Sequence, residues 1–103
     1  MELSKTYASD ADSIFDRTVR ICKELGYHTD SIDNSIRRIK ASTSASLFSY
    51  GEEIEIIVNH RGENRATVHV NAKPKVWFNI TSDTSTPVKH IFDKLDTAYK
   101  QVR

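Results

Sequence analysis

The amino-acid sequence predicts an α+β domain, an antiparallel β-sheet meander of about five to six strands with two helices packed on one face. Two stretches, residues 10–25 and 86–102, carry their large apolar side chains at helical spacing, so each predicts a helix with one buried side. Two others, residues 53–59 and 65–71, alternate apolar and polar residues, as strands with one buried face do. Only short turns separate successive strands, which favours a meander because parallel strands need long crossover connections.

Length and charge limit the possible classes of protein. The 103 residues predict a single domain, residues 1–103, with one hydrophobic core. Fifteen basic and fourteen acidic residues give a formal net charge of +1, so overall charge gives no reason to expect nucleic acid or an anionic membrane as partner. No stretch approaches the ~20 apolar residues of a membrane span, and the first residues lack an apolar leader, so we expect a cytoplasmic protein. A signal or lipoprotein peptide removed from a longer precursor would leave the same residues.

The first predicted elements are a short strand over residues 3–8 and a helix over residues 10–25. Ser9 and Asp12 have the spacing of a capping box at the start of this helix, and Gly26 is placed to end it. The strand should place these residues on one face: Leu3, Lys5 and Tyr7. The helix should bury these residues: Ala11, Ile14, Phe15, Thr18, Val19, Cys22 and Leu25.

Cys22 is the only cysteine in the chain. A single cysteine excludes an internal disulfide and the cysteine pairs of structural zinc sites. Because Cys22 falls on the apolar side of the first predicted helix, we expect a buried and unreactive thiol.

A hairpin is predicted next, with strands over residues 27–32 and 36–43 joined by a turn at residues 33–35. Asp, Asn and Ser in this turn can make their own turn hydrogen bonds. Ile36 has the wrong parity for the return strand, so we place it in the turn. The return strand should point the following residues outward, away from the helices: Arg38 and Lys40.

The second hairpin joins residues 53–59 and 65–71 through a turn at residues 60–64. Aligning the inner faces of the two strands predicts a register with these opposed pairs: Val58 with Ala66, Ile56 with Val68, Ile57 with Thr67, Glu55 with His69, and Glu53 with Asn71. A further strand is expected over residues 76–81, after the break at residues 73–75.

The final helix is expected to run from Thr86 to Val102 and to close the core. Thr86 should act as N-cap, and Pro87 suits the first helical position because it has no N–H to leave unpaired. Asp96 and Lys100 are spaced as an i,i+4 ion pair. The apolar stripe comprises Val88, Ile91, Phe92, Leu95, Ala98, Tyr99 and Val102.

Several segments carry a resemblance to known proteins. They are Leu25-Gly26-Tyr27, Ile32-Asp33, Ile39-Lys40-Ala41 and the helix Val88-Lys89-His90-Ile91-Phe92-Asp93-Lys94-Leu95. In these segments and in the order of its elements, the chain resembles a group of small bacterial domains of unknown function, many carried by lipoproteins. The resemblance implies the fold and supplies no catalytic residue, and the lipoprotein cysteine is missing from this sequence.

No motif in the sequence predicts an enzyme active site or a cofactor. The four histidines fall on four different predicted elements without ligand spacing, so we expect no metal and no cofactor. The sequence has no Gly-x-Ser-x-Gly elbow, and its glycines are isolated. The predicted pair of Glu55 and His69 has two interpretations, an oriented base or, as we prefer, a cross-strand charge pair that stabilises the sheet.

The outer sheet face is the candidate interaction surface, which comprises Ile57, His69, Trp77, Arg38 and Lys40. Trp77 is a large apolar ring among polar residues, which indicates cover by a ligand, a protein partner or a second copy of the chain, unless a loop or the N-terminal segment folds over it.

We therefore predict a non-catalytic binding or interaction module that uses this outer face or a groove between helix and sheet. One alternative is a small enzyme whose site forms at an oligomer interface. Another is a weak single-stranded nucleic-acid binder, which Glu53 and Glu55 in the middle of the surface argue against.

Overall fold

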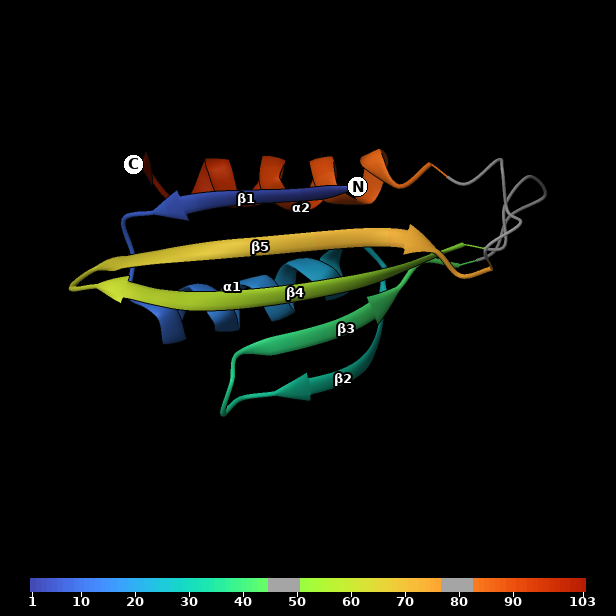
Figure 1. Cartoon of the computed structure of the whole chain (residues 1–103), viewed down its shortest axis with the longest axis horizontal. Helices are drawn as coiled ribbons and strands as arrows, with labels where there is room; N and C mark the ends of the chain where they lie inside the picture. Colours follow the sequence, from blue (N-terminus) through green and yellow to red (C-terminus); the bar gives the residue numbers. More distant parts are fainter. Residues whose placement is uncertain (45–50, 77–82) are drawn as a thin grey trace.

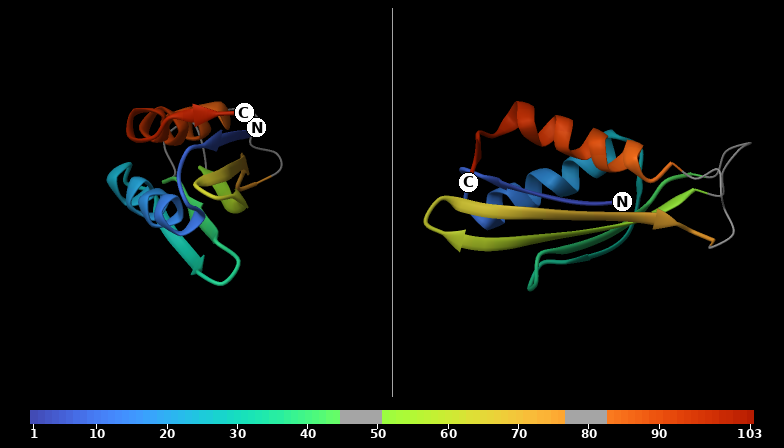
Figure 2. Two further views of the ribbon diagram at one scale, coloured as in Figure 1. Left: turned by 90° about the vertical axis from the view of Figure 1, so that its left-hand side faces the viewer. Right: turned by 45° about the horizontal axis from the view of Figure 1, so that its top comes forward.

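One antiparallel sheet and two helices make up the fold in residues 1–44, 51–76 and 83–103, the part of the chain that the computed structural model describes (Figure 1). The elements are β1 (Glu2–Tyr7), α1 (Ala11–Glu24), β2 (His28–Asp33), β3 (Arg38–Ser42), β4 (Glu52–Gly62), β5 (Arg65–Pro74), α2 (Ser85–Ala98) and β6 (Gln101–Val102). The six strands lie in the order β2-β3-β4-β5-β1-β6, and β2 to β5 form the predicted meander. Both helices cover the same face, which confirms the predicted α+β class (Figure 2).

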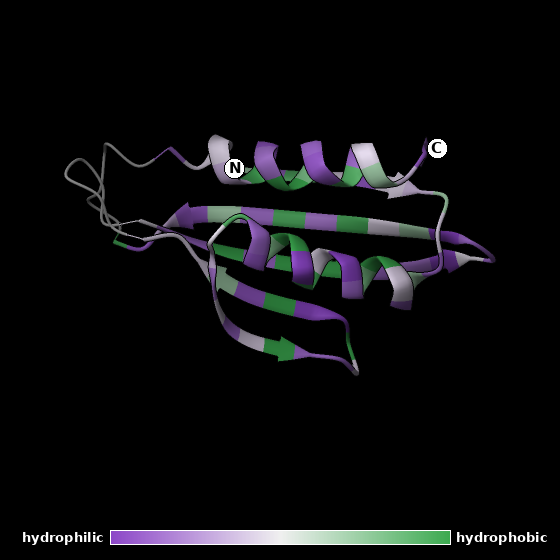
Figure 3. Ribbon diagram, turned by 180° about the vertical axis from the view of Figure 1, so that it is seen from behind, coloured by the Kyte–Doolittle hydropathy of each residue, from purple (hydrophilic) through white to green (hydrophobic). Residues whose placement is uncertain are grey.

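The core lies between the helices and the inner face of the sheet. Apolar and polar residues alternate along β4 and β5 (Figure 3). Every second side chain of these strands is therefore buried in the core. The largest fully buried side chains are Tyr7, Phe92, Ile14, Ile21, Ile39, Ile54, Ile56, Ile91, Leu95, Val58, Val68 and Val70.

Helix α1 begins one residue later than the predicted capping box requires. Asp10, and not Ser9, is the N-cap, because its carboxylate accepts the Ser13 N–H at 2.9 Å. Gly26 ends the helix as predicted, with a φ of 78° that L side chains rarely adopt. The buried side includes Ile21, which the prediction omitted although it lies seven residues after Ile14.

The hairpin of β2 and β3 has the predicted turn. Asp33 accepts hydrogen bonds from the backbone N–H of Ser35 at 3.0 Å and from its hydroxyl at 2.6 Å. Ile36 lies in the turn and is 55% exposed, as its parity predicts. Arg37 takes a positive φ of 53° just before β3 begins.

The register of β4 and β5 differs from the prediction by two residues. Gly62 is opposite Arg65, so the turn contains only Glu63 and Asn64 and is shorter than the predicted turn over residues 60–64. A bulge lies between His60 and Gly62. The observed pairs are Val58 with Val68, Ile56 with Val70, Ile57 with His69, Glu55 with Asn71, and Glu53 with Lys73. The faces are preserved, because side chains alternate with a period of two.

Helix α2 is shorter than predicted and is capped differently. The Asp83 carboxylate accepts the N–H groups of Ser85 and Thr86 at 3.0 and 3.3 Å, so Thr86 is not the N-cap. Hydrogen bonds from the Ser85 and Thr86 side chains lower the Asp83 pKa to about 2. Pro87 is the third helical residue and not the first.

The C-terminal residues leave the helix for the sheet. The helix ends at Ala98, and Gln101 and Val102 pair with β1 as β6, where backbone hydrogen bonds replace the predicted last helical turn. Asp96 does not form the predicted pair with Lys100, because Lys100 lies beyond the helix and Asp96 binds Lys5 and Tyr7. The strand predicted over residues 76–81 falls almost entirely outside the described residues.

Candidate functional site

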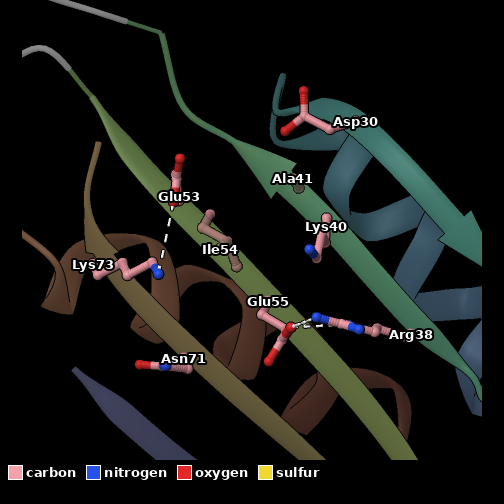
Figure 4. A pocket seen from close by; sticks show the side chains of 9 residues that line it. All are labelled: Asp30, Arg38, Lys40, Ala41, Glu53, Ile54, Glu55, Asn71 and Lys73. Carbon is pink, nitrogen blue, oxygen red and sulfur yellow. Dashed lines mark hydrogen bonds and ion pairs between the residues drawn. The ribbon is translucent and has the colours of Figure 1, made fainter. Parts of the chain in front are cut away.

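The face of the sheet opposite the helices carries a hollow of about 390 Å³ that spans β2, β3, β4 and β5 (Figure 4). Strand alternation supplies it with long polar side chains, since the outward residues that line it are all polar or charged. Its lining residues are Asp30, Arg38, Lys40, Ala41, Glu53, Ile54, Glu55, Asn71 and Lys73.

Arg38 and Glu55 form the tightest ion pair in the hollow. The Arg38 Nε donates to Glu55 Oε2 at 2.8 Å, and an Nη nitrogen of the same guanidinium binds the same oxygen (Figure 4). Both side chains keep just over a third of their exposure, so the pair contributes orientation more than stability.

Lys40 lies directly opposite Glu55 in the register of β3 and β4. The Glu55 carboxylate is bound by Arg38 instead, and Lys40 forms no ion pair within residues 1–44, 51–76 and 83–103. Its ammonium group therefore remains available to an anionic group in the hollow.

The remaining ion pair of the hollow is loose, and Asp30 has only a histidine beside it among the described residues. Lys73 Nζ lies 3.9 Å from a Glu53 carboxylate oxygen, and both side chains are more than half exposed. Asp30 lies 3.3 Å from the His28 ring. Asp30, Glu53 and Glu55 balance Arg38, Lys40 and Lys73 in number, so the hollow suits a polar ligand with groups of both signs.

Four of the five predicted surface residues share this face. Arg38 and Lys40 line the hollow, whereas Ile57 and His69 lie beside it. Arg38 is opposite Ile57, and Ile57 is opposite His69, so these three form one row across β3, β4 and β5. Trp77 lies outside the described residues.

The predicted pair of Glu55 and His69 does not form. Asn71 is opposite Glu55, and the Glu55 carboxylate is bound by Arg38. His69 Nδ1 lies 2.5 Å from the Ser4 hydroxyl, and its Nε2 is buried without a hydrogen-bond partner among the described residues. Both interpretations of the pair, the oriented base and the preferred cross-strand charge pair, are wrong, because the carboxylate that they required is bound by Arg38.

A second group of chemistry-bearing residues lies on the inner face, where the sequence interpretation placed only Cys22. Glu52 is 9% exposed and continues the inward row of Ile54, Ile56 and Val58. The Thr43 hydroxyl donates to its carboxylate at 3.0 Å and accepts the Glu52 backbone N–H at 2.8 Å. Strand parity alone could have identified Glu52 as an inward carboxylate.

Tyr27 and Cys22 share this end of the helix–sheet layer with Glu52. Burial, and then the charges of Cys22 and Glu52, raise the Tyr27 pKa to about 12. Burial raises the Cys22 pKa to about 11, so its thiol stays protonated at neutral pH.

Within residues 1–44, 51–76 and 83–103, no three His, Cys, Asp or Glu side chains gather to hold a metal ion. Neither of the helices described there is long and apolar enough to cross a membrane.

Comparison with known proteins identifies the fold. No family model and no curated protein matches the chain. Among solved structures, the chain is similar to the di-domain ARO/CYC StfQ from the steffimycin biosynthetic pathway, with 11% identity, a TM-score of 0.67 and coverage of 93% of this chain and 42% of that chain. It is also similar to the di-domain ARO/CYC BexL from the BE-7585A biosynthetic pathway, with 10% identity, a TM-score of 0.61 and coverage of 94% and 42%. The chain thus spans less than half of each neighbour.

Proposed function

We propose that this chain is a small, non-catalytic binding module that takes a polar ligand in the hollow on the outer face of the sheet. The observation that carries the proposal is Lys40, an ammonium group without an ion pair among the described residues, in a hollow where Arg38 pairs with Glu55 and Lys73 with Glu53. An anionic group of the ligand would gain a partner there without breaking an existing ion pair.

The lining favours a small molecule with a carboxylate and further hydrogen-bonding groups. The volume of about 390 Å³ suits a compact ligand. Lys40 would bind the carboxylate, while the Asn71 amide and the Glu53 carboxylate would accept from hydroxyl or amino groups. The likeness to proteins of two biosynthetic pathways supports a small-molecule ligand over a macromolecule.

The test is an NMR titration of ¹⁵N-labelled protein with soluble carboxylic acids that also carry hydroxyl or amino groups: malate, citrate and glutamate. We expect saturable shifts in β3, β4 and β5 and about tenfold weaker binding in Lys40→Gln, the loss of one charge-assisted hydrogen bond. Lys89→Gln, on the exposed side of α2, is the matched control and should bind as the wild type does. An unchanged affinity of Lys40→Gln for these acids would refute the proposal.

An enzyme is the second candidate, because Glu52 is a buried carboxylate beside Tyr27 and Cys22 in a fold shared with proteins described as ARO/CYC. A carboxylate shielded from water can act as a general base on a carbon acid. Exchange of the carbon-bound protons of acetylacetone in D₂O, followed by NMR, tests this chemistry. Exchange that is lost in Glu52→Gln but kept in Glu53→Gln, a change of the outward neighbour, would favour the enzyme. An exchange rate no higher than that of buffer alone would favour the binding module.

A further inference from the structure

A second hollow lies at the end of the sheet where the β4–β5 turn and the C-terminus are found (left in Figure 1). Its volume is about 310 Å³, and it shares no lining residue with the hollow on the outer face. The lining residues are Ala8, Arg61, Gly62, Glu63, Asn64, Arg65 and Val102. The ends of β1, β5 and β6 therefore meet the β4–β5 turn around it.

Arg61 is held in place by a short chain of hydroxyl groups. Its Nε donates to the Thr67 hydroxyl at 3.1 Å, and the Thr67 hydroxyl lies 2.8 Å from the Thr6 hydroxyl. This contact uses the inner nitrogen of the guanidinium and leaves its two outer nitrogens for another group. A guanidinium that is already oriented loses less conformational entropy when it binds an anion.

Arg65 faces the same hollow from the other side of the turn, where it is opposite Gly62. Neither Arg61 nor Arg65 forms an ion pair within residues 1–44, 51–76 and 83–103, although Glu63 also lines the hollow. Two guanidinium groups and one carboxylate leave the hollow with a net positive charge.

We propose that this hollow binds the single phosphoryl group of a small soluble phosphate ester. A carboxylate presents two oxygens in one plane, whereas a phosphoryl group presents three terminal oxygens in different directions and can bind Arg61 and Arg65 together. Glu63 repels additional negative charge, so one phosphoryl group is favoured over a polyphosphate. The remaining volume accommodates the hydroxylated part of the ester beside Glu63.

The proposal is tested by NMR titration of ¹⁵N-labelled protein with glycerol phosphate and inorganic phosphate, with sodium chloride added to hold ionic strength constant. We expect saturable shifts confined to residues 61–65 and to Ala8 and Val102. Arg61→Gln and Arg65→Gln should each weaken binding about tenfold, whereas Glu63→Gln should strengthen it. Arg20→Gln, an exposed arginine of α1, keeps the same change of net charge and should bind as the wild type does.

Three results would overturn the proposal. One is the absence of saturable shifts with both phosphate compounds. Another is equal affinity in Arg61→Gln, Arg65→Gln and the wild type, with folding of each variant checked by circular dichroism. The third is that glycerol phosphate does not bind, whereas single-stranded DNA or phosphatidic acid vesicles bind and require both arginines. That result would assign the site to a macromolecule or a membrane.

Discussion

Replacing Tyr7 with Phe should loosen the attachment of α2 to the edge of the sheet. The ring of Tyr7 is fully buried, and its hydroxyl donates to an Asp96 carboxylate oxygen at 2.7 Å. Lys5 donates to the other oxygen at 2.8 Å, and its ammonium lies 5.4 Å from the centre of the Phe92 ring. Asp96 thus joins two residues of β1 to α2.

The expected loss of stability in Tyr7→Phe depends on which contacts the substitution removes and which it keeps. Tyr7→Phe keeps the ring, so no cavity forms, and it removes one hydrogen bond to a charged acceptor, worth about 1.5–3 kcal/mol. Asp96 keeps Lys5 and has 37% of its side chain exposed, so water compensates part of the loss. We expect a loss of about 1–2 kcal/mol in the free energy of unfolding.

Urea unfolding of the wild type, Tyr7→Phe, Asp96→Asn and the double variant at pH 7 provides the measurement. The double-mutant cycle should give a coupling of about 1 kcal/mol between Tyr7 and Asp96. A coupling within error of zero would mean that the hydroxyl is as well satisfied by water, and the proposed attachment would be wrong.

The stability cost of Tyr7→Phe should depend on pH. Burial raises the Asp96 pKa, but the hydrogen bonds from Lys5 and Tyr7 outweigh it and leave the pKa below its usual range. The stabilisation is therefore fully present above the unfolded pKa of about 3.9 and is lost as pH falls through the lower folded pKa. The cost of Tyr7→Phe should shrink in acid, and a cost that grows below pH 4 would contradict the assignment.

Three further predictions concern the core and the surface. Leu95→Ala, at a fully buried position of α2, should cost about 2–5 kcal/mol in urea unfolding, whereas Thr97→Ala on the exposed side should change little; equal midpoints would contradict the assigned face. Cys22 should react slowly with a thiol reagent in native protein and quickly in unfolded protein, since burial raises its pKa to about 11; equal rates would place it on the surface. Trp77→Ala should weaken self-association or partner binding more than folding, as sedimentation and thermal unfolding would measure; a monomeric wild type would refute the self-association hypothesis.

Strand faces could be predicted from the sequence because alternation is a local property. The inward placement of Ile54, Ile56 and Val58 needed only the period of two. The register could not be predicted in the same way, because it depends on turn length. Asn64 adopts a φ of 53°, which allows a two-residue turn that shifts β5 by two positions.

Helix ends depended on competition between neighbouring groups. The carboxylates of Asp10, the N-cap of α1, and Asp83, just before the α2 N-cap Thr84, accept the first helical N–H groups, whereas Ser9 and Thr86 were the predicted caps. At the C-terminus, the apolar stripe extended the prediction to Val102, whereas pairing with β1 draws that residue into the sheet. Such tertiary pairing leaves no periodic signal in the sequence.

The candidate site depends both on strand alternation, which the sequence shows, and on side-chain contacts, which it does not. Parity predicts that Arg38, Lys40 and Glu55 point outward, and it equally places Glu52 inward. Parity does not decide which basic residue binds Glu55. Lys40 lies directly opposite Glu55, and Arg38 lies opposite Ile57, two residues further along β4. The longer Arg38 side chain nevertheless reaches the Glu55 carboxylate and makes two contacts with it. Because two contacts to one carboxylate outweigh one, Glu55 binds Arg38, and Lys40 is left without an ion pair among the described residues.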